Sequence, residues 1–139
     1  MEAAQALAYC VATMQADSAC AAAATGGIWH GFAPLGTVGP YILVTHQGGM
    51  DTTTANGARL FSDLVFQLKA VGPASSYAVL VAIADRIDAL FKRTGPTATS
   101  STSGVLSCIR EQQITYSELV NGAQIDHLGG LYRLKFQQS

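Results

Sequence analysis

Two segments of the chain alternate apolar and polar side chains with the two-residue period of a β-strand. In residues 59–71, one face carries Leu60, Leu64, Phe66 and Leu68. In residues 131–137, Tyr132, Leu134 and Phe136 alternate with Arg133, Lys135 and Gln137. A strand with one apolar face has to bury that face against another layer of secondary structure. The alternation therefore predicts a sheet with one covered face.

Two segments with helical periodicity predict the covering layer. One of them is residues 76–93. Ser75 or Ser76 can cap its start, and Gly95-Pro96 follows its end. Its apolar stripe consists of Leu80, Ile83, Ala84, Ile87, Leu90 and Phe91. Residues 1–24 form a second helical region, with Leu7, Cys10, Val11 and Met14 on one stripe. Asp17 either caps a short second helix there or lies within a single bent helix.

The other strands and loops are predicted from residue types and turn signals. Tyr41–Val44 is a short strand rich in branched side chains. Gln47–Gly57 has no apolar period and is predicted to be a hairpin loop, and the Thr/Ser-rich residues 94–104 to be a mobile loop. Val105–Val120 is a long strand that ends at a hairpin turn, Asn121-Gly122. Leu106, Cys108, Ile114 and Tyr116 occupy even positions along it and are expected to share one face.

Together these elements predict a single α+β domain over residues 1–139. Its sheet is mainly antiparallel, and the N-terminal helix and the second amphipathic helix pack on one face. The predicted parts are a helical N-terminus at 1–24, strands and a hairpin loop at 28–71, a helix at 76–93 and C-terminal strands at 105–137. A chain of 139 residues has the length of one domain.

Charge is scarce in this sequence. Charged residues make up 12% of the chain, about half the usual share, and the net charge is −1. Such a surface favours a protein partly covered by neighbours, although the many alanines inflate the apolar count and a monomer remains an alternative. The eight Lys and Arg residues are scattered rather than gathered into a basic patch. This excludes a protein that grips DNA through its phosphates.

The N-terminal residues resemble neither a signal peptide nor a membrane span. Glu2, Gln5, Gln15 and Asp17 interrupt the alanine-rich stretches, and no basic region precedes them. We therefore expect no membrane partner. The three cysteines cannot all pair within one chain, and Cys10 and Cys20 lie in helical sequence where a free thiol is usually a small buried apolar group. Synthesis in a reducing cytoplasm is expected.

No constellation of residues predicts catalysis, a metal or a cofactor. His30, His46 and His127 show no metal-binding spacing, and the glycine pairs match no phosphate-binding motif. Cys108, with His127 and Asp126, is the one arrangement that could serve a small cysteine hydrolase. No glycine elbow surrounds Cys108, and its position in the middle of a strand favours packing. We therefore predict a protein that is not an enzyme.

One series of motifs resembles the tail-completion, or tail-terminator, family of long-tailed bacteriophages. After a helical N-terminus come Ile28-Trp29, a glycine- and proline-rich loop at 31–36, and Pro40-Tyr41 opening a strand. A polar loop, a long strand, an alanine-rich helix and a final strand at 131–136 follow in the family's order. The resemblance covers nearly the whole chain.

The resemblance implies a structural virion protein, made in the host cytoplasm, that forms a ring, typically a hexamer, at the head-proximal end of the tail tube. Such a ring stops tube elongation and gives the head connector a docking surface. Its partners are copies of itself, the tail tube protein and the connector or stopper protein, and DNA passes through without specific binding. Edge strands of each subunit are covered by its neighbours.

Two candidate contact sites follow from this reading. The hairpin segment Gly49, Met50, Asp51, Thr52, Thr53 and Thr54 is the candidate partner-binding or channel-lining loop, although a solvated hairpin tip without a role is the alternative. Arg133 and Lys135 are candidate intersubunit contacts, or else a solvated sheet face. A head-side connector or stopper, a tail tube subunit and a ligand-binding α+β domain remain alternative functions.

Overall fold

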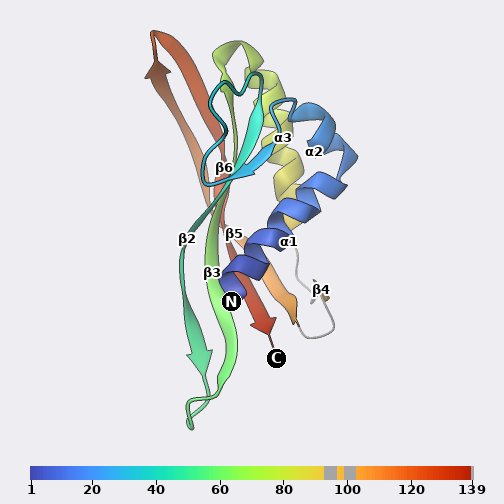
Figure 1. Cartoon of the computed structure of the whole chain (residues 1–139), viewed down its shortest axis with the longest axis vertical. Coiled ribbons are helices and arrows are strands. Elements are labelled where there is room, and N and C mark those ends of the chain that lie inside the picture. The colour runs from blue at the N-terminus through green and yellow to red at the C-terminus, as the bar shows by residue number, and fades with distance from the viewer. Residues whose placement is uncertain (93–96, 99–102, 139) are drawn as a thin grey trace.

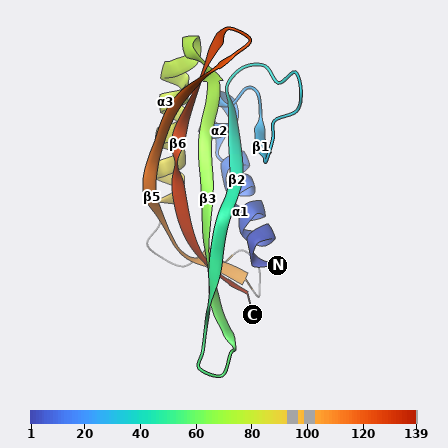
Figure 2. The same cartoon turned by 90° about the vertical axis from the view of Figure 1, so that its left-hand side faces the viewer.

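In the computed structural model, which describes residues 1–92, 97–98 and 103–138, six strands form one sheet with the order β1-β2-β3-β6-β5-β4. All neighbouring strands are antiparallel except β1 and β2, which are parallel. The helices of the described chain lie on one face of this sheet (Figures 1 and 2). The strands are β1 (Ile28–His30), β2 (Tyr41–Thr53), β3 (Arg59–Pro73), β4 (Thr97–Ala98), β5 (Ser103–Val120) and β6 (Ala123–Gln138). The predicted α+β class is confirmed.

The two alternating segments form β3 and β6, which pair with each other at the centre of the sheet. Leu64, Phe66 and Leu68 of β3 are buried against the helices, as are Tyr132, Leu134 and Phe136 of β6. Leu60 shares their register but is 46% exposed. It lies next to the β2–β3 turn in the sequence, and this hairpin end projects beyond the helix layer (Figure 1).

The prediction of a hairpin loop at Gln47–Gly57 is wrong for residues 47–53, which belong to a strand, and the turn lies at residues 54–58. β2 continues to Thr53, and residues Gly48–Thr53 pair with β3 down to Arg59. A bulge between His46 and Gly48 shifts the register, with Gly48 at a φ of +145°. The turn itself is short, closed by the Thr54 N–H donating to the Ala58 carbonyl at 2.7 Å. Backbone hydrogen bonds to β3 hold this segment as a strand without any apolar period.

β5 also departs from its predicted alternation. Register shifts lie between Val105 and Ser107 and between Arg110 and Gln112. Val105 and Cys108 are consequently buried on the same face. Leu106 and Tyr116, expected to share a face with Cys108, are half-buried and 42% exposed. Each bulge adds one residue and moves the following side chains to the other face.

The turn between β5 and β6 agrees with the sequence, whereas the preceding loop is only partly described. Asn121 and Gly122 have φ values of +51° and +78°, as a two-residue hairpin turn of mirror-image type requires. Most of the loop predicted over residues 94–104 lies outside the described residues. Within it, Thr97–Ala98 forms β4 and pairs with Gly104 and Val105.

The N-terminal region consists of two helices, α1 (Glu2–Ala16) and α2 (Ser18–Ala23), rather than one bent helix. Asp17 separates them in an extended conformation, and its carboxylate accepts a hydrogen bond from the Cys20 N–H at 3.0 Å. The same carboxylate accepts two hydrogen bonds from Arg86, at 2.6 and 2.9 Å. The buried residues of α1 are Ala6, Cys10 and Met14, while Leu7 and Val11 flank them half-buried.

The third helix, α3 (Tyr77–Phe91), follows a 3-10 turn at Ala74–Ser76. Its predicted stripe is confirmed: Leu80, Ile83, Ile87 and Phe91 are buried, with Ala84 and Leu90 at the margin. Ser76 occupies the capping position, but its side chain makes no cap hydrogen bond. The three cysteines form no disulfide and are buried, all of them within the same core cluster.

Candidate functional site

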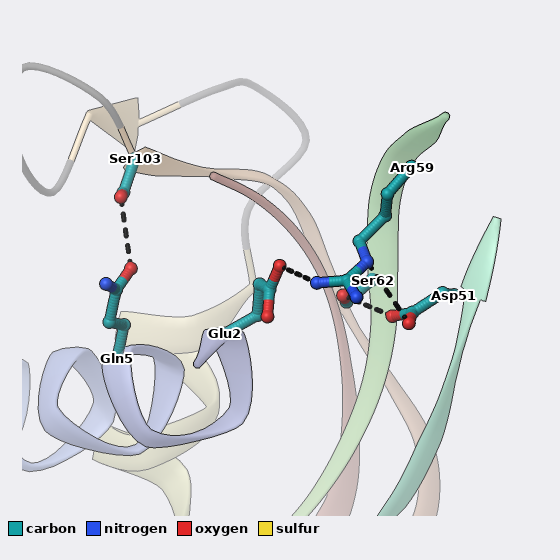
Figure 3. Close-up of polar contacts among 6 residues, drawn as sticks. All are labelled: Glu2, Gln5, Asp51, Arg59, Ser62 and Ser103. Carbon is teal, nitrogen blue, oxygen red and sulfur yellow. Dashed lines mark hydrogen bonds and ion pairs between the residues drawn. The ribbon is translucent and has the colours of Figure 1, made fainter. Parts of the chain in front are cut away.

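A recess with polar walls lies where the β2–β3 hairpin passes the start of α1 (Figure 3). The Arg59 guanidinium bridges the carboxylates of Glu2 and Asp51, the latter at 3.2 Å. The Ser62 hydroxyl donates to the other Asp51 oxygen at 2.6 Å. The Glu2 carboxylate accepts hydrogen bonds from the backbone of Glu2 and from Arg59, and these lower the pKa of Glu2. These contacts border a cavity of about 710 Å³ and tie the hairpin to the helix layer.

The predicted partner-binding loop Gly49–Thr54 lies along this hairpin as a strand and the first turn residue. Gly49 packs so closely on β3 that a Cβ there would lie 2.5 Å from the Asp63 carbonyl oxygen. Met50 is 70% exposed, and Asp51 belongs to the recess. Thr52 and Thr53 lie near the end of β2, and the Thr54 hydroxyl accepts a hydrogen bond from the Ala58 N–H at 3.1 Å. The partner role of this segment stays a prediction.

The two predicted intersubunit residues lie on the face of the sheet that the helices leave uncovered, here called the open face. Arg133 contacts Asp63 at 3.0 Å and also binds Glu111, and these hydrogen bonds raise its pKa. The Lys135 ammonium lies 5.3 Å from the centre of the Phe61 ring. Both side chains therefore have partners within the chain, and a contact with another subunit stays a prediction.

The open face also exposes apolar side chains along the four long strands. Ile109 is 53% exposed, and the others are half-buried. By strand register they comprise Leu43, Phe61, Val65, Ile109, Ile114 and Leu131. A face with this many apolar residues is typical of a surface that other proteins cover.

One polar cluster on the open face was not predicted. Lys69 is 7% exposed and donates to the Tyr116 hydroxyl at 2.6 Å. The His127 ring stacks on Tyr116 at a centroid distance of 4.3 Å, and its Nε2 lies 2.7 Å from a Glu118 oxygen. The His127 Nδ1 is buried without a hydrogen-bond partner. The pairing of β6 with β3 on one side and with β5 on the other brings these residues together, so no local motif signals the cluster.

We expect His127 to make the folded state less stable at acidic pH. Burial is the main cause that lowers the pKa of His127 from its ordinary value of 6.5. Below pH 6.5 the unfolded chain therefore takes up a proton that the folded chain refuses, and stability falls as pH drops towards the folded pKa. Urea denaturation between pH 8 and pH 5 should show this loss, and His127→Phe should reduce it. An unchanged pH slope in the variant would contradict the assignment.

The alternative cysteine hydrolase is not supported by the geometry. Cys108 is 1% exposed, faces the core and pairs with Leu134 on β6. His127 lies on β6 as well, seven residues or about 23 Å from Leu134, and its side chain is on the open face. A nucleophile and its base have to lie within hydrogen-bonding distance. Burial and the neighbouring Cys108 also raise the pKa of the Cys10 thiol, so Cys10 does not resemble a reactive thiolate.

The described residues contain no group of three or more side chains arranged to hold a metal ion. Among the same residues, no helix combines the length and the apolar character that a membrane span requires.

Comparison with known proteins adds one finding. No family model and no curated protein matches this sequence. A solved structure does, and it is described as the virion of a native gene transfer agent particle. That chain belongs to a virion. The alignment covers 96% of this chain and 93% of that chain with a TM-score of 0.69, at 17% sequence identity. The likeness establishes a shared fold along almost the entire length of both chains.

Proposed function

We propose that this chain is a structural virion protein that completes the tail of a phage or phage-like particle. It assembles as a homo-oligomeric ring, expected to be a hexamer, at the head-proximal end of the tail tube. The ring stops tube elongation and presents a surface to the head connector or stopper protein, and DNA passes through its centre. The observation that carries the proposal is the full-length fold shared with a chain of a virion particle.

The surface of the subunit supports an assembling protein. The open face carries half-buried apolar residues, and Phe32, Leu35 and Val38 in the loop before β2 are 91%, 106% and 83% exposed. With only 12% charged residues, the chain has little polar surface to keep such patches apart in solution. Subunits that bury these patches against each other around a closed rotation form a ring.

The test is tube elongation in the presence of the purified protein. Tail tube protein from the same particle is polymerised with and without this chain, and tube lengths are measured by negative-stain imaging. We expect shorter tubes, each with a ring at one end. Tubes of unaltered length with bare ends would contradict the proposal.

Deleting the gene distinguishes the neighbouring functions. Loss of a tail-completion protein should leave over-long tails, whereas loss of a head-side connector or stopper should leave heads that lose DNA. Loss of a tube subunit should leave no tubes. The latter two outcomes would each assign the chain to another position in the particle.

A further inference from the structure

Two long stretches of strand edge lack a partner in the described part of the chain. At one border of the sheet, β1 pairs only with Ile42–Val44, which leaves the outer edge of β2 free from Thr45 to Thr53. At the other border, β4 pairs only with Gly104 and Val105, so the outer edge of β5 is free from Leu106 to Val120. Unpaired backbone N–H and C=O groups along an edge are satisfied by water or by another strand.

Both edges contain β-bulges, which usually prevent a further strand from pairing, but the bulges affect only part of each edge. The bulge of β2 lies at Gln47, and the bulges of β5 lie before Gln112. Beyond them β5 is regular over the nine residues 112–120, of which Glu118 alone is charged. On β2, residues Gly48–Thr52 are regular as well. These two stretches are the ones open to a further strand.

We infer that the outer edge of β2 in one copy pairs antiparallel with the outer edge of β5 in the next copy. This inference rests on the proposed ring and names its joint. Three successive antiparallel pairings separate β2 from β5, so the two strands run in opposite directions within one chain. In a copy related by rotation about the ring axis, the strands keep these directions. The β5 strand of that copy is therefore antiparallel to the β2 strand of the first. Because the edges lie at opposite borders, the contact repeats head to tail and can close.

The lengths of the two edges match. The free edge of β2 from Thr45 to Thr53, with its bulge at Gln47, and the regular part of β5 at residues 112–120 each span about 30 Å. The free edge of β2 begins beside Gly31, whose N–H donates to the Val44 carbonyl at 2.9 Å, and the next residue is the exposed Phe32. A neighbouring β5 that ends there brings its Leu119 and Val120, 77% and 46% exposed, to this apolar loop.

Such a pairing requires a stagger between copies. Within one chain, Gly49 is aligned with Leu64 of β3, which pairs with Leu134 of β6, which in turn pairs with Cys108 near the start of β5. The regular part of β5, residues 112–120, lies closer to the C-terminal end of that strand. The neighbour is therefore displaced along the strands by several residues. Sheets that close on themselves show this displacement, because their strands tilt relative to the axis.

Cysteine cross-linking tests the joint. Met50 lies on the open face of β2, and Ile114 and Tyr116 lie on the open face of β5, so Met50→Cys combined with Ile114→Cys or Tyr116→Cys places thiols on the same side of the joint. The native cysteines are buried. On oxidation at the tube end we expect a ladder of covalent oligomers, with most of the monomer lost. The matched control is Met50→Cys with Gln113→Cys, which lies on the opposite face and should remain monomeric under denaturing electrophoresis.

Hydrogen exchange of the unmodified protein gives an independent readout. Assembly should slow exchange of the outward-pointing amides in 48–53 and 112–120 by on the order of tenfold or more. The amides that already pair within the subunit, including those of β3, should change little. Rings visible at tube ends without cross-links and without this protection would overturn the inference and leave the proposed function standing. A chain that forms no ring on its own tube would overturn the proposed function instead.

Discussion

Replacing Phe91 by alanine is expected to destabilise the fold by about 3–5 kcal/mol, the usual cost of removing a buried aromatic side chain. Phe91 is fully buried at the end of α3. Its ring contacts Tyr9 of α1 edge to face at 6.3 Å and Tyr132 of β6 at 6.0 Å. The Phe91 ring thus joins α1 and α3 to the sheet, and its loss leaves a cavity where α1, α3 and β6 meet. Urea denaturation of the monomer measures the change in the free energy of unfolding.

The matched control for Phe91→Ala is Val79→Ala on the same helix. Val79 is 40% exposed, so its truncation should change stability by less than about 0.5 kcal/mol. Equal losses in the two variants would contradict the placement of α3, because they would mean that residue 91 is no better packed than a surface position.

Replacing Gly129 by alanine is expected to cost about 3 kcal/mol, at the upper end of the range for overpacked sites. A Cβ on Gly129 would lie 2.1 Å from the Leu68 carbonyl oxygen and 2.5 Å from the Lys69 Cα. Both are backbone atoms of β3, so no side chain can rotate away. Strands β3 and β6 would have to separate at the centre of the sheet, and Lys69 would move from the polar cluster.

The control for Gly129→Ala is Gln137→Ala, an exposed position on the same strand. It should leave the free energy of unfolding and the midpoint of denaturation nearly unchanged. A Gly129→Ala variant as stable as this control would show that β3 and β6 are further apart than the structure has them.

Local pattern was enough to predict the elements that bury one face. Leu64, Phe66 and Leu68 on β3 and the stripe of α3 are buried as predicted. The Asn121-Gly122 turn is also where its residues require it, because few other residues adopt positive φ at both positions. In each case the signal lies within a few residues of sequence.

The candidate contact segment shows where local pattern fails. Residues Gly49–Thr53 combine glycine, threonine and aspartate, which are typical of a loop, yet they form the end of β2. Likewise, the even register of Leu106 and Cys108 is broken by a bulge. The cluster of Lys69, Tyr116 and His127 has no signal in the sequence, since its members come from three strands.

The sequence by itself determined which segments are helical or extended and which of their faces are apolar, because side-chain periodicity is a property of a few neighbouring residues. The tertiary structure alone decided that β2 runs on to Thr53 and that β3 and β6 are central. It also decided that most of the outer edge of both β2 and β5 has no partner strand among the described residues. The physical reason is that strands are joined through backbone groups, which every residue except proline carries in full, so side chains do not specify the partner.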